Sequence, residues 1–311
     1  MDSSNFFCLN PKYSTTRLLT KKKAGFVKEI PLRAQRRDEG GLRLRGYYKK
    51  RVADKPLVSV ITATLNSEKY LEETIQSVIN QTYDNVEYII CDGCSTDGTL
   101  DVIREYDDKI DCWVSEPDGS MYEAINKGIR LSCGDIVAIL NSDDKYASPD
   151  VMEQMVRNFR QYSDIDGFYG DVIKLYPTHT IYRRLFQVDY KEYLLARQGT
   201  FVPHPTLFVR RGCIQKIGLY NTHYRYASDY DFILKLLKNY KLKYVNKPFI
   251  FFRLHDGNIS SSENIRLESL SILNDHNIGS YHRAYRFIMY AYLWGKYVLL
   301  NFLHTKRTLG E

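Results

Sequence analysis

From residue 57 onward, short apolar runs of the chain alternate with segments whose apolar residues recur at helical spacing. The run at 58–64 is rich in β-branched residues, and the stretch after it places Leu71, Ile75, Val78 and Ile79 on one helical face. Strands that alternate with helices predict parallel βαβ units joined by right-handed crossovers. We therefore expect an α/β fold with helices on both faces of a mostly parallel central sheet.

The same alternation continues through the rest of the domain. Thr96 or Asp97 is positioned to cap one helix, and Ser148 and Pro149 introduce another, since proline is tolerated in a first helical turn. Further strands are expected at 86–91, 112–115, 136–140, 168–174, 181–186 and 249–252, and further helices at 96–106, 122–131, after 149 and at 229–240.

The formal net charge of +7 is concentrated in the first 51 residues, which carry 14 Lys or Arg against 4 Asp or Glu. This arm contains Pro31 and the pair Gly40 and Gly41 and has little hydrophobic periodicity, so we expect weak independent structure. It is either a solvated tail or an electrostatic attachment to an anionic membrane surface, where each basic residue contributes ~1 kcal/mol. Nucleic acid is not an expected partner, because no basic motif interleaved with aromatic residues is present.

Residues 287–303 are apolar and aromatic, with Lys296 inside the segment and basic residues on both sides. A segment of this length falls at or below what a membrane-spanning helix needs. A helix lying in the membrane interface fits its Trp and Tyr content better. The alternative is that the segment packs on the domain or on a partner subunit, and a homo-oligomer is therefore one of the expected possibilities.

The six cysteines follow no disulfide-framework spacing, and no signal-peptide pattern opens the sequence. Cys91 and Cys94 form a lone CxxC pattern, whereas a structural zinc site needs a second pair of ligands. We interpret them as incidental thiols and expect a cytoplasmic protein that lies peripherally on the inner face of the membrane.

Polar side chains follow four consecutive strands of the predicted sheet. Ligands bind at the carboxyl ends of strands in open α/β sheets, and Mg²⁺ is held by one or two carboxylates together with substrate phosphates. Asp143 and Asp144, just after the run at 136–140, therefore suit a Mg²⁺ or Mn²⁺ ion that carries a diphosphate. This position alone indicates a nucleotide-dependent transferase. The groups at the other strand ends are Thr62, Thr64, Asn66, Asp92, Glu116 and Asp118.

Several segments resemble the inverting family 2 glycosyltransferases of the GT-A fold, a Rossmann-like nucleotide-diphospho-sugar transferase fold, and above all the bacterial enzymes that build O-antigen and capsular polysaccharide. The resemblance spans roughly 57–261 and covers neither tail. The matching segments are VSVITATLN at 58–66, QSVINQT at 76–82, DGCSTDGT at 92–99, EPDGSMYEAINKG at 116–128, NSDD at 141–144, ASDYDF at 227–232 and RLH at 253–255.

The resemblance implies roles on the nucleotide side. Asp143 matches the direct metal ligand of the family's DXD motif, with Asp144 beside it. Asn141 stands where a first Asp is frequent, which removes a charge but keeps a group that can donate and accept hydrogen bonds. Asp92 would hydrogen-bond the uracil of a UDP-sugar, Asp118 would lie near the ribose or sugar, and the nucleotide pocket would be lined by Thr62, Thr64 and Asn66.

An acceptor hydroxyl is a poor nucleophile near neutral pH, so a carboxylate must accept its proton as attack proceeds. Asp229, in the segment that resembles the acceptor-side acidic motif, is the candidate base; a helix N-cap and an exchange of roles with Asp231 are the alternatives. Asp231 lies two residues on, so one of the pair should point away. His255 would complete the metal shell or touch the diphosphate, or is an ordinary strand-end histidine. His204 either shapes the acceptor cleft or belongs to a rigid loop.

The resemblance and the residues together predict an inverting hexosyltransferase. It would move a hexose or N-acetylhexosamine from a UDP-sugar to a lipid-linked saccharide or growing bacterial glycan by a metal-dependent single displacement. One alternative is a nucleotide-sugar-binding scaffold without turnover. The other is a sugar nucleotidyltransferase, which needs a glycine-rich, basic loop after the first strand that residues 64–67 do not provide.

These expectations divide the chain into three parts. Residues 1–55 form the basic arm, residues 56–262 form the GT-A domain, and residues 263–311 form a helical, aromatic segment. Within the domain, 56–145 is the nucleotide half and 146–262 the acceptor half. A chain of 311 residues with 44% hydrophobic content is long enough for one large domain with such appendages.

Overall fold

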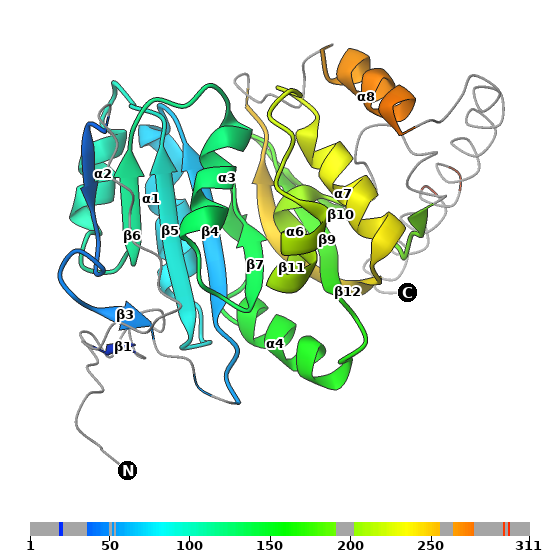
Figure 1. The fold of residues 1–311 in the computed structure, drawn as a ribbon, viewed down its shortest axis with the longest axis horizontal. Helices are drawn as coiled ribbons and strands as arrows, with labels where there is room; N and C mark the ends of the chain where they lie inside the picture. Colours follow the sequence, from blue (N-terminus) through cyan, green and yellow to red (C-terminus); the bar gives the residue numbers. More distant parts are fainter. Residues whose placement is uncertain are drawn as a thin grey trace.

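The structure, a computed structural model, describes residues 19–20, 36–49, 52, 54–190, 202–255, 264–276, 295 and 298. Its centre is a mixed sheet with the strand order β2-β6-β5-β4-β7-β11-β9-β12-β8, and β10 pairs with β9 beside this path. Helices cover both faces of the sheet (Figure 1). The predicted α/β architecture is confirmed.

The half of the sheet that comes first in the sequence is parallel. Its strands are β4 (Val58–Thr64), β5 (Val86–Asp92), β6 (Cys112–Ser115) and β7 (Ile136–Ile139). Their residues are almost all buried because helices lie on both faces, which explains continuous apolar runs in place of alternation. The connecting helices are α1 (Glu68–Ile79), α2 (Thr99–Glu105) and α3 (Met121–Leu131).

The second half of the sheet is mixed. β11 (Phe208–Arg210) runs antiparallel between β7 and β9 (Gly167–Leu175), and β12 (Leu242–Arg253) pairs parallel with β9. β8 (Lys145–Tyr146) and β10 (Thr180–Arg183) pair antiparallel with β12 and β9. The helical elements are α4 (Val151–Gln161), the 3₁₀ turn η2 (His204–Thr206), α6 (Arg211–Ile217), α7 (Ser228–Asn239) and α8 (Asn264–Asp275).

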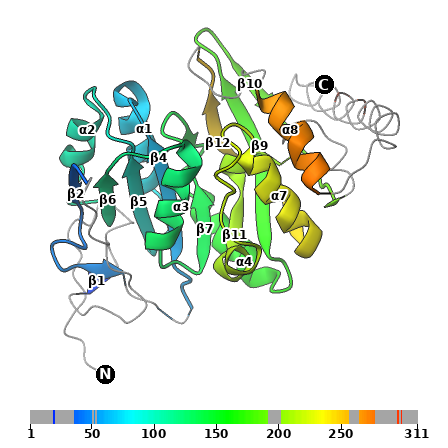
Figure 2. The ribbon, with the colours of Figure 1, turned by 45° about the horizontal axis from the view of Figure 1, so that its top comes forward.

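Two hydrophobic clusters occupy the two faces of the sheet. Successive residues of a strand point to opposite faces. Ile61 of β4 therefore belongs to the cluster that includes residues of α3 and α7, and Val60 to the cluster that includes residues of α1 and α4. Figure 2 shows α3 and α7 together in front of the sheet, with α8 beside α7. The first cluster therefore joins the nucleotide half to the acceptor half.

Residues 36–49 of the predicted basic arm fold onto the sheet. β2 (Asp38–Gly40) pairs antiparallel with β6, and β3 (Tyr48–Lys49) pairs with β1 (Leu19–Thr20). The glycines that suggested weak structure instead permit close packing: a Cβ at Gly40 would lie 2.5 Å from the ring of Trp113, and Gly41 has a φ of +98°. This stretch differs from the expectation of weak structure because its order depends on the neighbouring sheet.

Two element boundaries also differ from the sequence-based expectation. The helix expected at 96–106 begins at Thr99, and Oδ1 of Asp97 accepts a hydrogen bond of 3.0 Å from the Thr99 backbone N–H. Asp97 therefore satisfies a free N–H of the first turn. The strand expected at 181–186 ends at Arg183. After the strand, the backbone N–H of Leu185 donates a hydrogen bond of 2.6 Å to Oδ1 of Asp171.

Within the described ranges, no helix is both long enough and apolar enough to cross a membrane. The aromatic segment at 287–303 lies outside the described residues except for positions 295 and 298. Its attachment to a membrane stays a prediction.

Candidate active site

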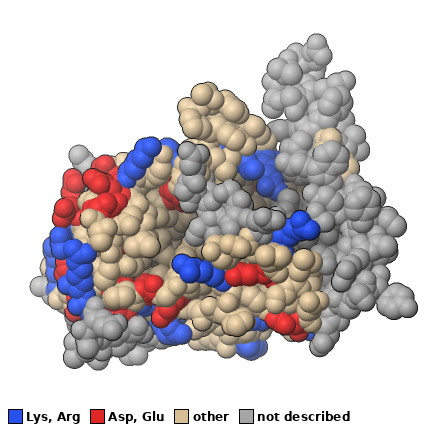
Figure 3. All heavy atoms as spheres, turned by 90° about the horizontal axis from the view of Figure 1, so that it is seen from above, with Lys and Arg blue, Asp and Glu red and all other residues tan. Residues whose placement is uncertain are grey.

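The carboxyl ends of β4, β5, β6 and β7 lie at one edge of the sheet because these strands are parallel. The side chains expected to bind the donor follow these strand ends, so the fold brings them to this edge. Figure 3 views the molecule from above, toward the carboxyl edge, and shows acidic and basic side chains around an indented middle.

Asp143 and His255 form the polar pair at the ends of β7 and β12. Nε2 of His255 lies 2.9 Å from Oδ2 of Asp143, and both side chains are partly exposed. The ring of Tyr70 lies 5.5 Å from the imidazole, and Nε of Arg253 donates to the carbonyl oxygen of Asp143 at 3.1 Å. The fold thus brings a carboxylate oxygen and an imidazole nitrogen together from two residues that are 112 positions apart in the sequence.

Asp144 faces the protein interior, unlike its neighbour. It is 1% exposed, Oδ1 accepts from the Arg253 backbone N–H at 3.0 Å, and Oδ2 accepts from Nδ2 of Asn141 at 2.9 Å. Burial, and then the charge of Asp143, raise the pKa of Asp144 well above its usual value. Asp144 and Asn141 therefore support the loop that presents Asp143.

The pair of Asp143 and His255 fits a divalent cation that takes its other ligands from a diphosphate and water. Of the three metal ligands expected from the sequence, these two come together and are partly exposed, whereas Asp144 is buried. Among the residues that the structure describes, no group of three or more His, Cys, Asp or Glu side chains could hold a metal ion.

Asp92 and Thr62 are enclosed at the ends of their strands. Oδ2 of Asp92 accepts from the Ser115 hydroxyl at 2.6 Å and from the Ser95 backbone N–H at 3.1 Å, and its residue is fully buried. Oγ1 of Thr62 lies 3.2 Å from the hydroxyl of Tyr88, also in the interior. In this structure Asp92 ties together the loops after β5 and β6, and its hydrogen bond to a uracil stays a prediction.

Thr64 and Asn66 lie closer to solvent. The hydroxyl of Thr64 is buried and has no hydrogen-bond partner among the described residues. Asn66 is exposed with a φ of +51°, and its Oδ1 accepts from the Thr96 backbone N–H at 2.9 Å. Their place in the wall of a nucleotide pocket stays a prediction.

Asp118 belongs to a buried charge network after β6. Nζ of Lys127, on α3, lies 2.8 Å from Oδ1 of Asp118 and 2.8 Å from Oε1 of Glu116. Burial raises the pKa of Asp118, and the ammonium group of Lys127 opposes that increase. The ion pair with Lys127, in the helix that follows, therefore fixes the position of Asp118.

Asp229 lies in the first turn of α7 and contacts α3. Its Oδ1 accepts a hydrogen bond of 3.1 Å from the Tyr122 hydroxyl and one of 2.9 Å from the Tyr230 backbone N–H. Burial, and then the charge of Asp229, raise the pKa of Tyr122 well above its usual value, so the phenol stays protonated and donates. Oδ2 of Asp229 has no donor among the described residues, and the residue is partly exposed.

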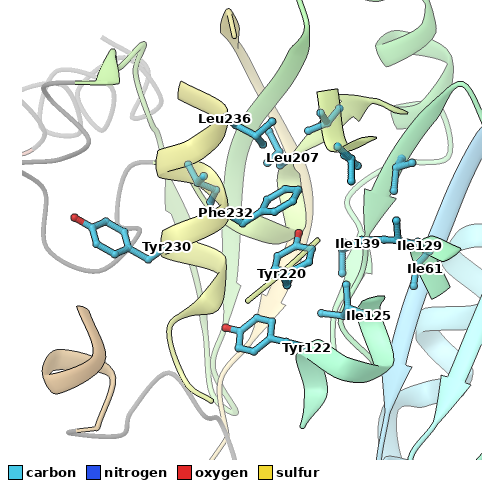
Figure 4. Packing of buried hydrophobic residues seen from close by; sticks show 14 of the residues in the cluster. Ile61, Tyr122, Ile125, Ile129, Ile139, Leu207, Tyr220, Tyr230, Phe232 and Leu236 are labelled. Carbon is cyan, nitrogen blue, oxygen red and sulfur yellow. The ribbon is translucent and has the colours of Figure 1, made fainter. Parts of the chain in front are cut away.

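Aromatic rings support this contact from below. Tyr220 stacks on Tyr122 with centroids 5.7 Å apart and on Phe232 with centroids 4.1 Å apart. Figure 4 shows Tyr122 beside the start of α7, and Tyr230 pointing away on the other side of that helix. His204 is 7% exposed, its Nε2 is hydrogen-bonded to the Tyr220 hydroxyl, and burial lowers its pKa. His204 therefore belongs to the packing behind Asp229 and does not form the surface of a cleft.

Asp231 points away from Asp229, as the spacing predicts. It is 3% exposed, and its carboxylate binds Nζ of Lys235 at 2.6 Å and Nε2 of His276, at the end of α8, at 2.8 Å. An exchange of roles with Asp229, or contact with an acceptor, finds no support in this position.

Two contributions escaped the sequence-based prediction. Tyr122 lies inside a matching segment, but its helical spacing marks it only as a core residue. Glu268 of α8 accepts hydrogen bonds from three successive backbone N–H groups, those of residues 225, 226 and 227, at 2.8, 2.6 and 2.9 Å. These amides directly precede α7, and no local pattern links them to a glutamate about 40 residues later.

Comparison with known proteins agrees with this geometry. The profile of Glycosyl transferase family 2 matches residues 59–218. An uncharacterized glycosyltransferase of Mycobacterium tuberculosis is 32% identical over 181 residues, which covers 58% of this chain and 68% of the relative. A PGL/p-HBAD biosynthesis glycosyltransferase of Mycobacterium bovis is 30% identical over 187 residues and covers 59% and 71%.

Solved structures share the fold at low sequence identity. S. aureus TarS 1–349 in complex with UDP has a TM-score of 0.59 at 17% identity, covering 76% of this chain and 70% of that one. This chain covers 43% of the longer TarS structure. The mannosyltransferase PcManGT of Pyrobaculum calidifontis has a TM-score of 0.55 at 17% identity and covers 77% and 70%. The chain therefore belongs to glycosyl transferase family 2 and is a glycosyltransferase with the GT-A fold.

Proposed function

We propose that this enzyme transfers a hexose or N-acetylhexosamine from a UDP-sugar to a lipid-linked saccharide or growing glycan with inversion at the anomeric carbon. The observation that carries the proposal is the hydrogen bond between Tyr122 and Asp229. Because α3 begins just after β6, this bond holds Asp229 at the carboxyl edge, where Asp143 and His255 also lie.

The transfer needs one proton acceptor and one leaving diphosphate. The acceptor oxygen forms a bond to the anomeric carbon while the bond from that carbon to the diphosphate oxygen breaks, and UDP leaves. Oδ2 of Asp229 accepts the proton of the attacking hydroxyl, since Oδ1 is occupied by Tyr122 and the Tyr230 backbone N–H. Attack opposite the leaving group gives the inverted product.

The donor side rests on Asp143 and His255. These residues would hold Mg²⁺ or Mn²⁺, which when bound neutralises charge on the diphosphate. The Thr64 hydroxyl, which is buried and has no partner in the described part of the chain, and the exposed amide of Asn66 suit the nucleotide. Two neighbours of the fold support this class of donor, since their structures contain UDP-GlcNAc, and GDP-Man with Mn²⁺.

We also propose that the reaction takes place at the inner face of the bacterial cytoplasmic membrane. The basic residues before position 36 and the aromatic segment at 287–303 would hold the enzyme at an anionic surface. A lipid-linked acceptor would then reach Asp229 from the membrane side. One relative carries a name in PGL/p-HBAD biosynthesis, which supports an acceptor of this general kind.

The test is UDP release from a panel of UDP-sugars with Mn²⁺ and lipid-linked acceptors. Asp229→Asn keeps the shape of the side chain and removes the proton acceptor, so we expect kcat to fall ~10²- to 10⁴-fold. Calorimetry should show unchanged binding of UDP with Mn²⁺. Asp108→Asn, at an exposed carboxylate paired with Lys109, is the matched control and should keep full activity.

Each alternative outcome has a distinct meaning. Wild-type turnover by Asp229→Asn would place the base elsewhere. Tight binding of UDP without release toward any acceptor would favour the nucleotide-sugar-binding scaffold.

A further inference from the structure

The segment formed by residues 36–49, here named the N-terminal strap, touches the same loops that form the donor side of the site. It lies outside the stretch that matches the family profile, which begins at residue 59. β2 of the strap pairs with β6 from Asp38 to Gly40, and the Arg37 backbone N–H donates to the Ser115 carbonyl at 2.8 Å. The strap therefore reaches the carboxyl end of β6.

Arg37 continues from the strap to the loop after β5. Its Nη1 donates to the backbone carbonyl of Ser95 at 2.7 Å. Ser95 is the residue whose backbone N–H and hydroxyl bind the carboxylate of Asp92. A single arginine on the strap thus holds the turn that fixes Asp92.

Arg36 continues from the strap to the loop after β6. Its guanidinium lies 3.2 Å from Oε2 of Glu116, and both side chains are at least nine-tenths buried. Glu116 also pairs with Lys127, and Lys127 pairs with Asp118, each at 2.8 Å. Arg36 also pairs with Glu39 at 2.6 Å. Arg36, Glu116, Lys127 and Asp118 therefore form a chain of ion pairs that ends at Asp118.

Such a chain is sensitive to the loss of one member. Removing one partner of a buried ion pair leaves an uncompensated charge, which is strongly unfavourable. Without Arg36, Glu116 would lose one of its cationic partners, and Lys127 is the cation that Glu116 shares with Asp118. We expect Lys127 to shift toward Glu116 and Asp118 to lose its fixed position.

The other cations of the strap anchor it to the domain. Arg43 pairs with Glu87 in the interior, and Lys49 lies 3.6 Å from Asp111. Arg45 pairs with Asp107 at the surface, where its side chain is 51% exposed. Four of the strap cations, Arg36, Arg43, Arg45 and Lys49, are therefore paired with carboxylates of the protein.

We propose that Arg36 and Arg37 are positioning residues for the UDP-sugar: they hold the loops after β5 and β6, and so place Asp92 and Asp118 for the donor. This inference rests on the proposed function, which supplies the donor. It predicts that the strap controls donor affinity without taking part in the chemical step.

The experiment compares Arg36→Met with Arg45→Met in the full-length protein. Both changes remove one strap cation that is paired with carboxylates, Arg36 with Glu39 and Glu116 and Arg45 with Asp107, but only the first disturbs the buried chain. For Arg36→Met we expect the Kd of UDP with Mn²⁺, measured by calorimetry, and the KM of the UDP-sugar to rise roughly tenfold, with kcat within about twofold of wild type. Arg45→Met should match the wild type in both, and Arg36→Lys should restore part of the affinity.

Arg37→Met is the second variant. Removal of the Arg37 guanidinium leaves the Ser95 carbonyl without this donor but leaves no buried charge unpaired. This variant keeps the test decisive if Arg36→Met fails to fold. We expect it to raise the same Kd and KM by a smaller factor of about three to five. A thermal melt shows whether each variant is folded at the assay temperature. Binding is then compared only between folded proteins.

Folded Arg36→Met or Arg37→Met protein that binds UDP as tightly as the wild type would overturn the inference. An equal loss of affinity in Arg45→Met would also overturn it, since the effect would then be a general one of strap charge. Failure of the wild type to bind UDP would instead refute the proposed donor, so the two failures are distinguishable.

Discussion

The hydroxyl of Tyr122 donates a hydrogen bond of 3.1 Å to Oδ1 of Asp229 and thereby joins the first turn of α3 to the first turn of α7. The two helices come from different halves of the domain and pack on the same face of the sheet. Both residues are supported from the interior, Tyr122 by the ring of Tyr220 and Asp229 by its own helix. The Tyr122 hydroxyl therefore helps to set the distance between α3, in the nucleotide half, and α7, in the acceptor half.

Tyr122→Phe keeps the ring and removes only this hydrogen bond. Because a hydrogen bond to a charged group contributes ~1.5–3 kcal/mol, we expect kcat to fall about 10- to 100-fold. The KM of the UDP-sugar should stay near the wild-type value, since the donor-side residues are untouched. Steady-state kinetics of UDP release measures both, and Tyr162→Phe, at a ring that contacts Lys243 away from this edge, is the control. Unchanged kcat would show that Asp229 does not need Tyr122.

His255→Ala removes one member of the pair that suits a divalent cation. We expect the Mn²⁺ concentration for half-maximal activity to rise ~10- to 100-fold, with partial recovery at high Mn²⁺. The exposed His179, which stacks on Tyr176, provides the control variant His179→Ala. A metal titration at saturating donor distinguishes the two. The same Mn²⁺ dependence in both variants would remove His255 from the metal site.

Glu268→Gln tests whether α8 holds the segment before α7. The glutamine keeps one acceptor oxygen and replaces the other with a donor, so at least one of the three backbone N–H groups loses its partner. We expect kcat to fall about fivefold to tenfold through looser placement of Asp229, while UDP binding is unchanged. Glu105→Gln, at an exposed glutamate at the end of α2, should have no effect. Weakened UDP binding in Glu268→Gln would instead indicate a general loss of structure.

Asp231→Asn should affect stability and spare catalysis. Burial raises the pKa of Asp231, but the hydrogen bonds and charges of His276 and Lys235 outweigh burial and lower it overall. A carboxylate with a lowered pKa stabilises the fold above its unfolded pKa of ~3.9, and this contribution is lost as the pH falls through the lower, folded value.

We therefore expect Asp231→Asn to lower the free energy of unfolding by ~1–3 kcal/mol at pH 7 and by progressively less below about pH 4. Urea denaturation of both proteins at a series of pH values measures the difference. The kcat at pH 7 should stay within about twofold of wild type. A large loss of kcat in the folded variant would revive an exchange of roles with Asp229.

The parallel half of the sheet was predictable because each strand is buried on both faces. The run at 58–64 and β4 have the same bounds, and the expected strand at 112–115 coincides with β6. His255 was expected either to complete the metal shell or touch the diphosphate, or to be an ordinary strand-end histidine. The structure brings it to Asp143, and its role in a metal site stays a prediction. β2 was not, because an edge strand of three residues carries no periodicity and depends on its partner β6.

The sequence by itself determined the α/β architecture, the edge at which the polar groups gather and the family of the enzyme, because these depend on hydrophobic runs and motifs that are local in the chain. Only the tertiary structure decided which carboxylate is exposed. Asp143 and Asp144 are adjacent, yet Asp144 turns inward because the backbone N–H of Arg253, 109 residues later, and the amide of Asn141 take its oxygens. Contacts at such separation leave no local pattern, since they form only when distant strands meet.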